Sequence, residues 1–364
     1  MKQVARNHFN CDSMNGIRLE NQPTSDDCFG NHWEERLAWD ESLSAHKTSK
    51  SIPDSLSPFT LALLEDTGWY RANFTMSRII SFGHGAGCSF VEKPCIVKNN
   101  LPNYSKGYFC NSTEQEDYAC DPSHSQISSC DLQNLKQSVP YVYRYFDNKF
   151  LGPKIFKQAD FCPMPIDFIF SCKRPIPKIL GSLKIFPEEK FAKSSRCYNS
   201  NYTRPLCLET FCDKDNHAIK VSLGKGRTAT CSDDKQLLIP HPDNEKILVS
   251  IECPRLATLC PDLICPTNCA GRGLCDWNSS NPKCLCFDGN KQSETCEWHE
   301  NVGKTLEKKK TPKKVGKTLE KKKTPKKVKT RTQPDQMSGT SLPSFQTMYL
   351  LIGWALGLTF YYYE

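Results

Sequence analysis

The chain has 364 residues, 21 cysteines and a formal net charge of +8. So many cysteines are typical of a protein that folds in an oxidising compartment, where they form cross-links, so a cytosolic location is excluded and an extracellular protein expected. Fourteen lysines and arginines and two glutamates lie between 302 and 331, a net of +12 that leaves −4 for the rest of the chain. The folded part therefore has no basic excess, and we expect no nucleic-acid partner.

The N-terminal residues 1–11 (MKQVARNHFNC) lack the apolar region of a secretory signal peptide. Outside a compact C-terminal module 15 cysteines remain, and an odd number leaves one thiol unpaired. We expect a missing upstream segment that would resolve both points; the alternative is a free or intermolecularly bridged cysteine. Five glycosylation triplets agree with secretion, at Asn73, Asn103, Asn111, Asn201 and Asn278.

Residues 1–95 contain one helix that local signals predict. Ser57 is its expected N-cap, Pro58 a first-turn residue, and Gly68 its end. Residues 96–253 are rich in cysteine, proline and aromatic residues, which favours irregular, disulfide-held structure. Short apolar runs at 168–170 and 247–251 are suited to strands.

Six cysteines between Cys265 and Cys296 form a dense pattern that resembles an EGF-like domain. A module of about 30 residues needs cross-links to fold, because it buries too little apolar surface. Spacing alone leaves fifteen pairings open, and a zinc knuckle is a weaker alternative, since no histidine lies inside the span. The resemblance implies the disulfides Cys265–Cys275, Cys269–Cys284 and Cys286–Cys296.

A perfect tandem repeat, VGKTLEKKKTPKK, follows at 302–314 and 315–327. Its single leucine per copy cannot form a buried face and its like charges repel, so we predict an extended, solvated spacer. The alternative is a selected contact with polyanions such as heparin-like glycans or anionic lipid head groups.

The last apolar stretch, 348–363, is shorter than the approximately 20 residues of a membrane span. Small residues including Ser338 and Gly339, followed by a spacer, resemble a glycosylphosphatidylinositol attachment signal. A short transmembrane anchor is the rival interpretation, and both predict membrane tethering at the cell surface.

Several motifs occur in a fixed order over residues 4–300. They are ARNHFNC at 5–11, LENQ at 19–22, GNHWE at 30–34, ALLEDTGWY at 62–70 and GAGC at 85–88. This series resembles leishmanolysin and its animal relatives, the invadolysins. The resemblance implies a cell-surface zinc metalloendopeptidase that cleaves extracellular proteins or peptides.

By this resemblance His32 occupies the position of the third zinc ligand. Such enzymes carry two further histidines four residues apart on one helix, with a catalytic glutamate between them. None of the eight histidines here has that spacing, so no catalytic residue is predicted in this chain. The resemblance places the missing helix ahead of Met1, and we expect the chain alone to be inactive and its Zn²⁺ site incomplete.

Leu43 stands at the position of the family's Met-turn methionine, which forms a floor beneath the metal. Leucine has nearly the same volume, so its packing role can persist. Glu34 and Glu35 are interpreted as solvated helix-surface charges rather than general bases. His84 in GHGAGC is interpreted as a loop residue without chemistry, and no nucleophile elbow, P-loop or dinucleotide fingerprint occurs.

The predicted fold class is α+β with five segments. They are the C-terminal part of a metzincin-like catalytic domain (1–95), a Cys-rich domain (96–253), an EGF-like module (254–300), the Lys-rich spacer (301–332) and the anchor tail (333–364). Two functions compete. The first is a metalloendopeptidase lineage whose zinc-binding helix lies outside this sequence; the second is a non-catalytic surface protein for adhesion or ligand binding, which Leu43 and the spacer favour.

Overall fold

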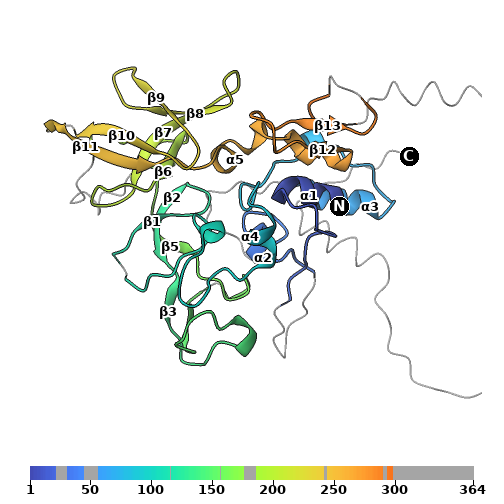
Figure 1. Ribbon diagram of the computed structural model, residues 1–364, viewed down its shortest axis with the longest axis horizontal. Helices are drawn as coiled ribbons and strands as arrows, with labels where there is room; N and C mark the ends of the chain where they lie inside the picture. The colour runs from blue at the N-terminus through green and yellow to red at the C-terminus, as the bar shows by residue number, and fades with distance from the viewer. Residues whose placement is uncertain are drawn as a thin grey trace, which may run out of the picture. The chain divides into compact units, whose positions relative to one another are not determined.

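The computed structural model describes residues 1–21, 31–44, 56–114, 116–155, 157–175, 186–241, 244–289 and 293–297 (Figure 1). The Lys-rich spacer and the anchor tail, with Ser338 and Gly339, lie outside these ranges, as does Cys28. Within them the chain is a mixed α and β protein rich in disulfides, in agreement with the predicted class.

The helices of the described ranges are short. The α-helices are α1 (Lys2–Phe9), α2 (Glu35–Ala38), α3 (Pro58–Asp66), α4 (Cys88–Glu92) and α5 (Leu256–Leu259). The 3₁₀ helices are η1 (Phe74–Met76), η2 (Asn103–Ser105), η3 (Tyr141–Tyr143), η5 (Pro261–Leu263) and η6 (Pro266–Gly271).

The strands form small antiparallel sheets. A three-stranded sheet has the order β1 (Ala119–Cys120), β2 (Gln126–Cys130), β5 (Pro165–Ser171), and a four-stranded sheet has the order β6 (Ser195–Tyr198), β7 (Leu206–Asp213), β8 (Ala218–Ser222), β9 (Thr228–Cys231). The two-stranded pairs are β3 (Leu132–Asn134) with β4 (Leu151–Pro153), β10 (Gln236–His241) with β11 (Asn244–Glu252), and β12 (Gly273–Cys275) with β13 (Cys284–Cys286). The strands predicted at 168–170 and 247–251 are confirmed within β5 and β11.

The helix predicted from local signals is confirmed as α3. Ser57 caps it by accepting a hydrogen bond at Oγ from the backbone N–H of Phe59 (3.2 Å), and Pro58 is its first residue. Gly68 follows the last turn with a φ of 76°, a left-handed conformation that glycine adopts without a steric cost. The cap is tied to the core, because Ser57 Oγ also donates to Glu41 Oε1 (2.7 Å).

Two large hydrophobic clusters hold the described chain together. The first, which we call the N-terminal core, runs from Val4 to Ile166 and adds Ala270; four of its phenylalanines, Phe9, Phe59, Phe82 and Phe90, are at most 1% exposed. The second, the C-terminal core, runs from Phe186 to Cys296. The N-terminal core thus continues past residue 95, where the sequence suggested a domain boundary.

Ten disulfides pair all 20 cysteines of the described ranges. In the C-terminal module they link Cys265 with Cys275, Cys269 with Cys284 and Cys286 with Cys296, the pairs that the EGF-like resemblance implies. These pairings favour the disulfide-held module over the zinc-knuckle alternative, because a cysteine in a disulfide has no thiolate to offer a metal.

The N-terminal helix lies beside this C-terminal module, with α1 next to β12 (Figure 1). The Asn7 side-chain amide donates to the carbonyls of Asn268 and Gly273 (both 2.9 Å), and Trp277 Nε1 donates to the Asn7 carbonyl (2.8 Å). Residues about 260 positions apart in the sequence therefore share one buried hydrogen-bond network.

Candidate functional site

His32 lies where three short stretches of chain run side by side. Trp33 forms an antiparallel bridge with Leu19 and a parallel bridge with Ser44. The backbone N–H of Glu20 donates to the His32 carbonyl and that of Trp33 donates to the Leu43 carbonyl, both at 3.0 Å. The backbone thus holds the LENQ segment, the His32 motif and the Leu43 position together.

The His32 imidazole is anchored by a carboxylate. Its Nδ1 lies 2.9 Å from Glu20 Oε1, and the histidine side chain is 40% exposed whereas that of Glu20 is 11% exposed. An ionised carboxylate can only accept, so the bond needs the proton on Nδ1 and leaves the lone pair on Nε2 in the neutral ring. Within the described ranges Nε2 has no hydrogen-bond partner.

This arrangement is suited to a metal ligand. Metal-binding histidines typically donate their second ring N–H to a carboxylate or carbonyl, which fixes the tautomer and orients the ring. The next residue, Trp33, is 3% exposed and its Nε1 donates to Thr60 Oγ1 (3.1 Å). Leu43 is half-buried against the N-terminal core. The surroundings of His32 therefore fit one imidazole ligand of a zinc site.

The other ligands of such a site are not gathered here. Among the described residues no group of three potential metal ligands includes His32. His8, His84 and His124 are buried, and each has a ring nitrogen within hydrogen-bond distance of a backbone carbonyl. His46 and His299 lie outside the described ranges.

The prediction that Glu34 and Glu35 are solvated surface charges is wrong. Both have 0% exposure, because the four residues of α2 are buried on every side. Glu34 caps α2 by accepting from the Arg36 backbone N–H (3.2 Å). Burial, the largest effect, and the charge of Asp160 raise the pKa of Glu34 to about 8.

Arg36 shows why this charged segment is internal. Its guanidinium donates to the carbonyls of Phe90 and Val91 (both 3.1 Å) and to that of Lys93, at the C-terminal end of α4. One buried side chain thus satisfies three backbone acceptors that would otherwise need water. The local sequence, a run of charged residues, suggested a solvated surface because it does not reveal acceptors that lie more than fifty residues away.

His84 is a loop residue, as predicted, but one that lies in the protein interior. Its ring stacks on His8 with centroids 4.9 Å apart, meets Trp277 edge-on at 5.1 Å, and places Nδ1 3.3 Å from the Ala257 carbonyl. Burial lowers the pKa of His8 to about 4 and that of His84 well below its ordinary value. Both rings are therefore neutral at pH 7 and serve packing.

The asparagines of the five predicted glycosylation triplets are exposed, which sugar attachment requires: Asn73, Asn103, Asn111, Asn201 and Asn278. No helix in the described ranges combines the length and apolar character that crossing a membrane requires.

Comparison with known proteins adds an independent finding. A sequence profile of the family described as leishmanolysin matches residues 1–266. Leishmanolysin-like peptidases of Drosophila pseudoobscura pseudoobscura and Caenorhabditis elegans are 32% and 27% identical over 216 and 186 residues, which cover 54% and 46% of this chain and 31% and 27% of theirs. Leishmanolysin of Leishmania tropica is 25% identical over 229 residues, 60% of this chain and 34% of its own. The chain spans about a third of the length of these curated relatives.

Proposed function

Because this chain belongs to the leishmanolysin family, whose members are zinc metallopeptidases, we propose that it supplies the C-terminal part of a zinc metalloendopeptidase that cleaves extracellular proteins or peptides. The observation that carries the proposal is the Glu20–His32 pair. It presents a histidine with a fixed tautomer and a free Nε2 at the position of the family's third zinc ligand.

In this proposal His32 would be one ligand of Zn²⁺, with two further imidazoles supplied by a helix outside this sequence. Zinc bound in such a site would lower the pKa of a water molecule to about 7 and polarise the peptide carbonyl. The residues of this chain orient and support: Glu20 keeps the proton on Nδ1, Trp33 fixes the backbone behind the ring, and Leu43 takes the place of the Met-turn residue.

The chain by itself is proposed to be inactive, because one imidazole holds zinc weakly and the general-base glutamate of the family is absent. The test is a chimera in which the part of the Drosophila pseudoobscura pseudoobscura peptidase that precedes its matched segment is joined to this chain. We expect zinc-dependent casein hydrolysis by the chimera, its loss in His32→Ala, and none by the chain alone. An active chimera that keeps its activity in His32→Ala would contradict the ligand assignment.

The second candidate is a non-catalytic surface protein for adhesion or ligand binding. The replacement of methionine by Leu43 and the Lys-rich spacer support it. A folded chimera with bound zinc but no peptidase activity, restored by Leu43→Met, would favour this candidate for the present sequence.

The location is also proposed to be the cell surface. Ten disulfides and five exposed glycosylation triplets support an extracellular, glycosylated protein. An EGF-like module, a solvated Lys-rich spacer open to polyanions, and a lipid-anchored tail with attachment near Ser338 and Gly339 complete the proposal; the apolar tail as a transmembrane anchor is the alternative. Release of the protein from cells by a phosphatidylinositol-specific phospholipase would distinguish the two anchors.

A further inference from the structure

Three basic side chains, Arg78, Lys173 and Arg196, line one small pocket of about 40 Å³. They come from three separate parts of the chain: the stretch before Ile79, the end of β5, and β6. We call this site the basic pocket. Its other walls include Ser81, Ser123 and the turn between α5 and η5.

No carboxylate of the described residues lies within ion-pair distance of a cation of the basic pocket. Asp40, the acid that lines the pocket, is half-buried and accepts hydrogen bonds from the Ser81 N–H and hydroxyl (both 2.9 Å). Arg78 is exposed, whereas Lys173 and Arg196 are partly buried, which reduces the screening of their mutual repulsion by water.

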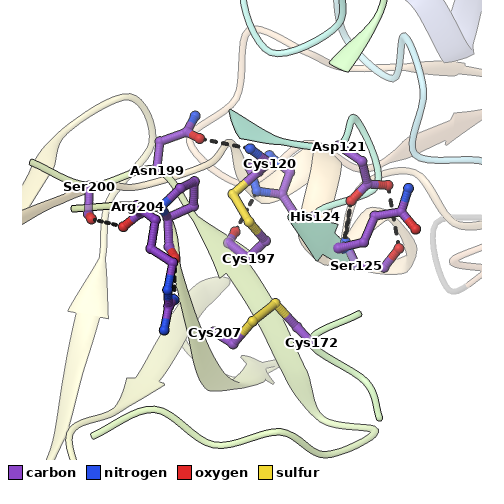
Figure 2. Close-up of a disulfide and its surroundings, with 12 residues drawn as sticks. Cys120, Asp121, His124, Ser125, Cys172, Cys197, Asn199, Ser200, Arg204 and Cys207 are labelled. Atoms are coloured by element: carbon purple, nitrogen blue, oxygen red, sulfur yellow. Dashed lines mark hydrogen bonds between the residues drawn. A yellow bond between two sulfur atoms is a disulfide. The ribbon is translucent and has the colours of Figure 1, made fainter. Parts of the chain in front are cut away.

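Two further acids lie near the cations without forming ion pairs with them: Asp262 interacts with Arg78 and Asp121 with Lys173. Figure 2 shows the Asp121 carboxylate hydrogen-bonded at Ser125; Oδ1 accepts from the backbone N–H of Ser125 (2.7 Å) and of Gln126 (2.8 Å). These bonds fix Asp121 on the turn between β1 and β2. The negative charge of Asp121 partly offsets the repulsion that Lys173 experiences from the two arginines, but Asp121 forms no ion pair with Lys173.

Disulfides hold two of the cations in place. Lys173 follows Cys172, which is bridged to Cys207, and Arg196 precedes Cys197, which is bridged to Cys120; Figure 2 shows both bridges close together. Cys197 and Cys207 are also cross-strand partners in the β6–β7 pair. The pocket cannot relieve its repulsion by moving these two segments apart, so its charges are preorganised.

We propose that the basic pocket binds one tetrahedral oxyanion, the sulfate group of a sulfated saccharide. Guanidinium and ammonium groups are the donors that such oxyanions accept in proteins. A volume of about 40 Å³ holds a small anion and no larger group, so the rest of the ligand extends into solvent, as a saccharide bearing a sulfate ester would. Burial, and then Arg196 and Arg78, lower the pKa of Lys173 to about 8, which agrees with an unneutralised cation cluster.

Binding should be linked to protons at Lys173. Arg196 and Arg78 oppose its protonation and Asp121 favours it, while Asp40 lines the same pocket. An added anion favours the charged ammonium, so binding takes up protons near pH 8 and tightens as the pH falls from 9 to 7.

The experiment is calorimetric titration of the purified whole chain with sodium sulfate at constant ionic strength. We expect Lys173→Met and Arg196→Met to weaken sulfate binding by about 10- to 100-fold, since each removes a charged hydrogen-bond donor. The matched control Lys98→Met removes an equally large charge from an exposed site and should leave the affinity unchanged. Equal affinities in Lys173→Met and Lys98→Met would overturn the proposal.

Two further measurements keep the test decisive. Without sulfate, Lys173→Met should unfold at the same temperature as the parent chain or a higher one, because it removes repulsion; thus weak binding by this variant is not a folding defect. A sulfated heparin disaccharide should bind more tightly than its unsulfated counterpart, with proton uptake at pH 8 that Lys173→Met abolishes. Binding of inorganic sulfate without a preference for the sulfated disaccharide would overturn the saccharide assignment. No zinc or peptidase activity enters these readouts, so their failure is separate from that of the proposed function.

Discussion

The buried ion pair between Arg204 and Glu189 gives the sharpest test of the C-terminal core. The two side chains are 4% and 0% exposed, and two parallel hydrogen bonds of 2.8 Å join the guanidinium to both carboxylate oxygens. Glu189 also accepts from the backbone N–H groups of Phe186 and Cys207, both at 2.9 Å. The Glu189 carboxylate therefore links the segment before β6 to β7 through hydrogen bonds.

Arg204→Met is the informative perturbation. It retains an apolar side chain near the Phe170 ring, over which the guanidinium carbon lies at 5.4 Å, and it leaves Glu189 buried with two donors instead of four. Removing one partner of a buried ion pair costs about 3–5 kcal/mol of unfolding free energy, mostly because the remaining charge is uncompensated. Adding Glu189→Gln should recover part of that loss by removing the charge. The recovery is incomplete, since the N–H groups of Phe186 and Cys207 bond to different carboxylate oxygens, and in glutamine one of them would face the amide NH2 group.

The measurement is guanidinium unfolding of the oxidised protein, with hydrogen exchange of the amides in 186–210 to localise the effect. Lys190→Met is the matched control, because the Lys190–Glu209 pair has a similar length, 2.6 Å, but its lysine is 56% exposed. Exposed pairs contribute about 0–1 kcal/mol. Equal losses in Arg204→Met and Lys190→Met, or no recovery on adding Glu189→Gln, would refute the reasoning.

Three further predictions concern the N-terminal half. Acid should destabilise the fold through His8, because its folded pKa of about 4 lies below the unfolded value of 6.5. The contribution of neutral His8 to the free energy of unfolding is complete above pH 6.5 and falls by about 3 kcal/mol as the pH drops from 6.5 to 4. In a plot of stability against pH, His8→Gln should flatten this region. Gly85→Ala should lower stability by about 1–3 kcal/mol in thermal unfolding, since Gly85 has a φ of +69° and a Cβ there would lie 2.7 Å from the Trp277 ring; Gly107→Ala, with open space, is the control for positive φ. In the active chimera Glu20→Gln should weaken zinc binding by about 10- to 100-fold in a chelator competition, and an unchanged affinity would show that Glu20 does not orient His32.

Features that depend on neighbouring residues were predictable from the sequence. Ser57, Pro58 and Gly68 each act within one turn of α3, so local chemistry was enough to place that helix. The disulfides of the 265–296 module followed from a resemblance carried by cysteine spacing. His32 was found through its motif, and Glu20 lay in a second motif whose contact with His32 only the folded backbone reveals.

Features that depend on residues far away in the chain could not be predicted from the sequence. The burial of Glu34 follows from α2 being enclosed by the N-terminal core, and Arg36 finds its acceptors more than fifty residues later. His84 is interior because α1 and Trp277 cover it. A sequence presents such residues as charges and loop positions, since the groups that compensate their burial are specified elsewhere in the chain.

The folded structure that supports α1 extends beyond the residues that match the family profile. The leishmanolysin family profile matches residues 1–266, and Asn7 receives or donates hydrogen bonds beyond that range, at Asn268, Gly273 and Trp277. Polar groups buried on α1 are satisfied only when that later module is in place, and an unsatisfied buried amide is costly. The C-terminal module is therefore part of the structure that supports α1 and the N-terminal core, against which Leu43 packs and to which Trp33, next to His32, belongs.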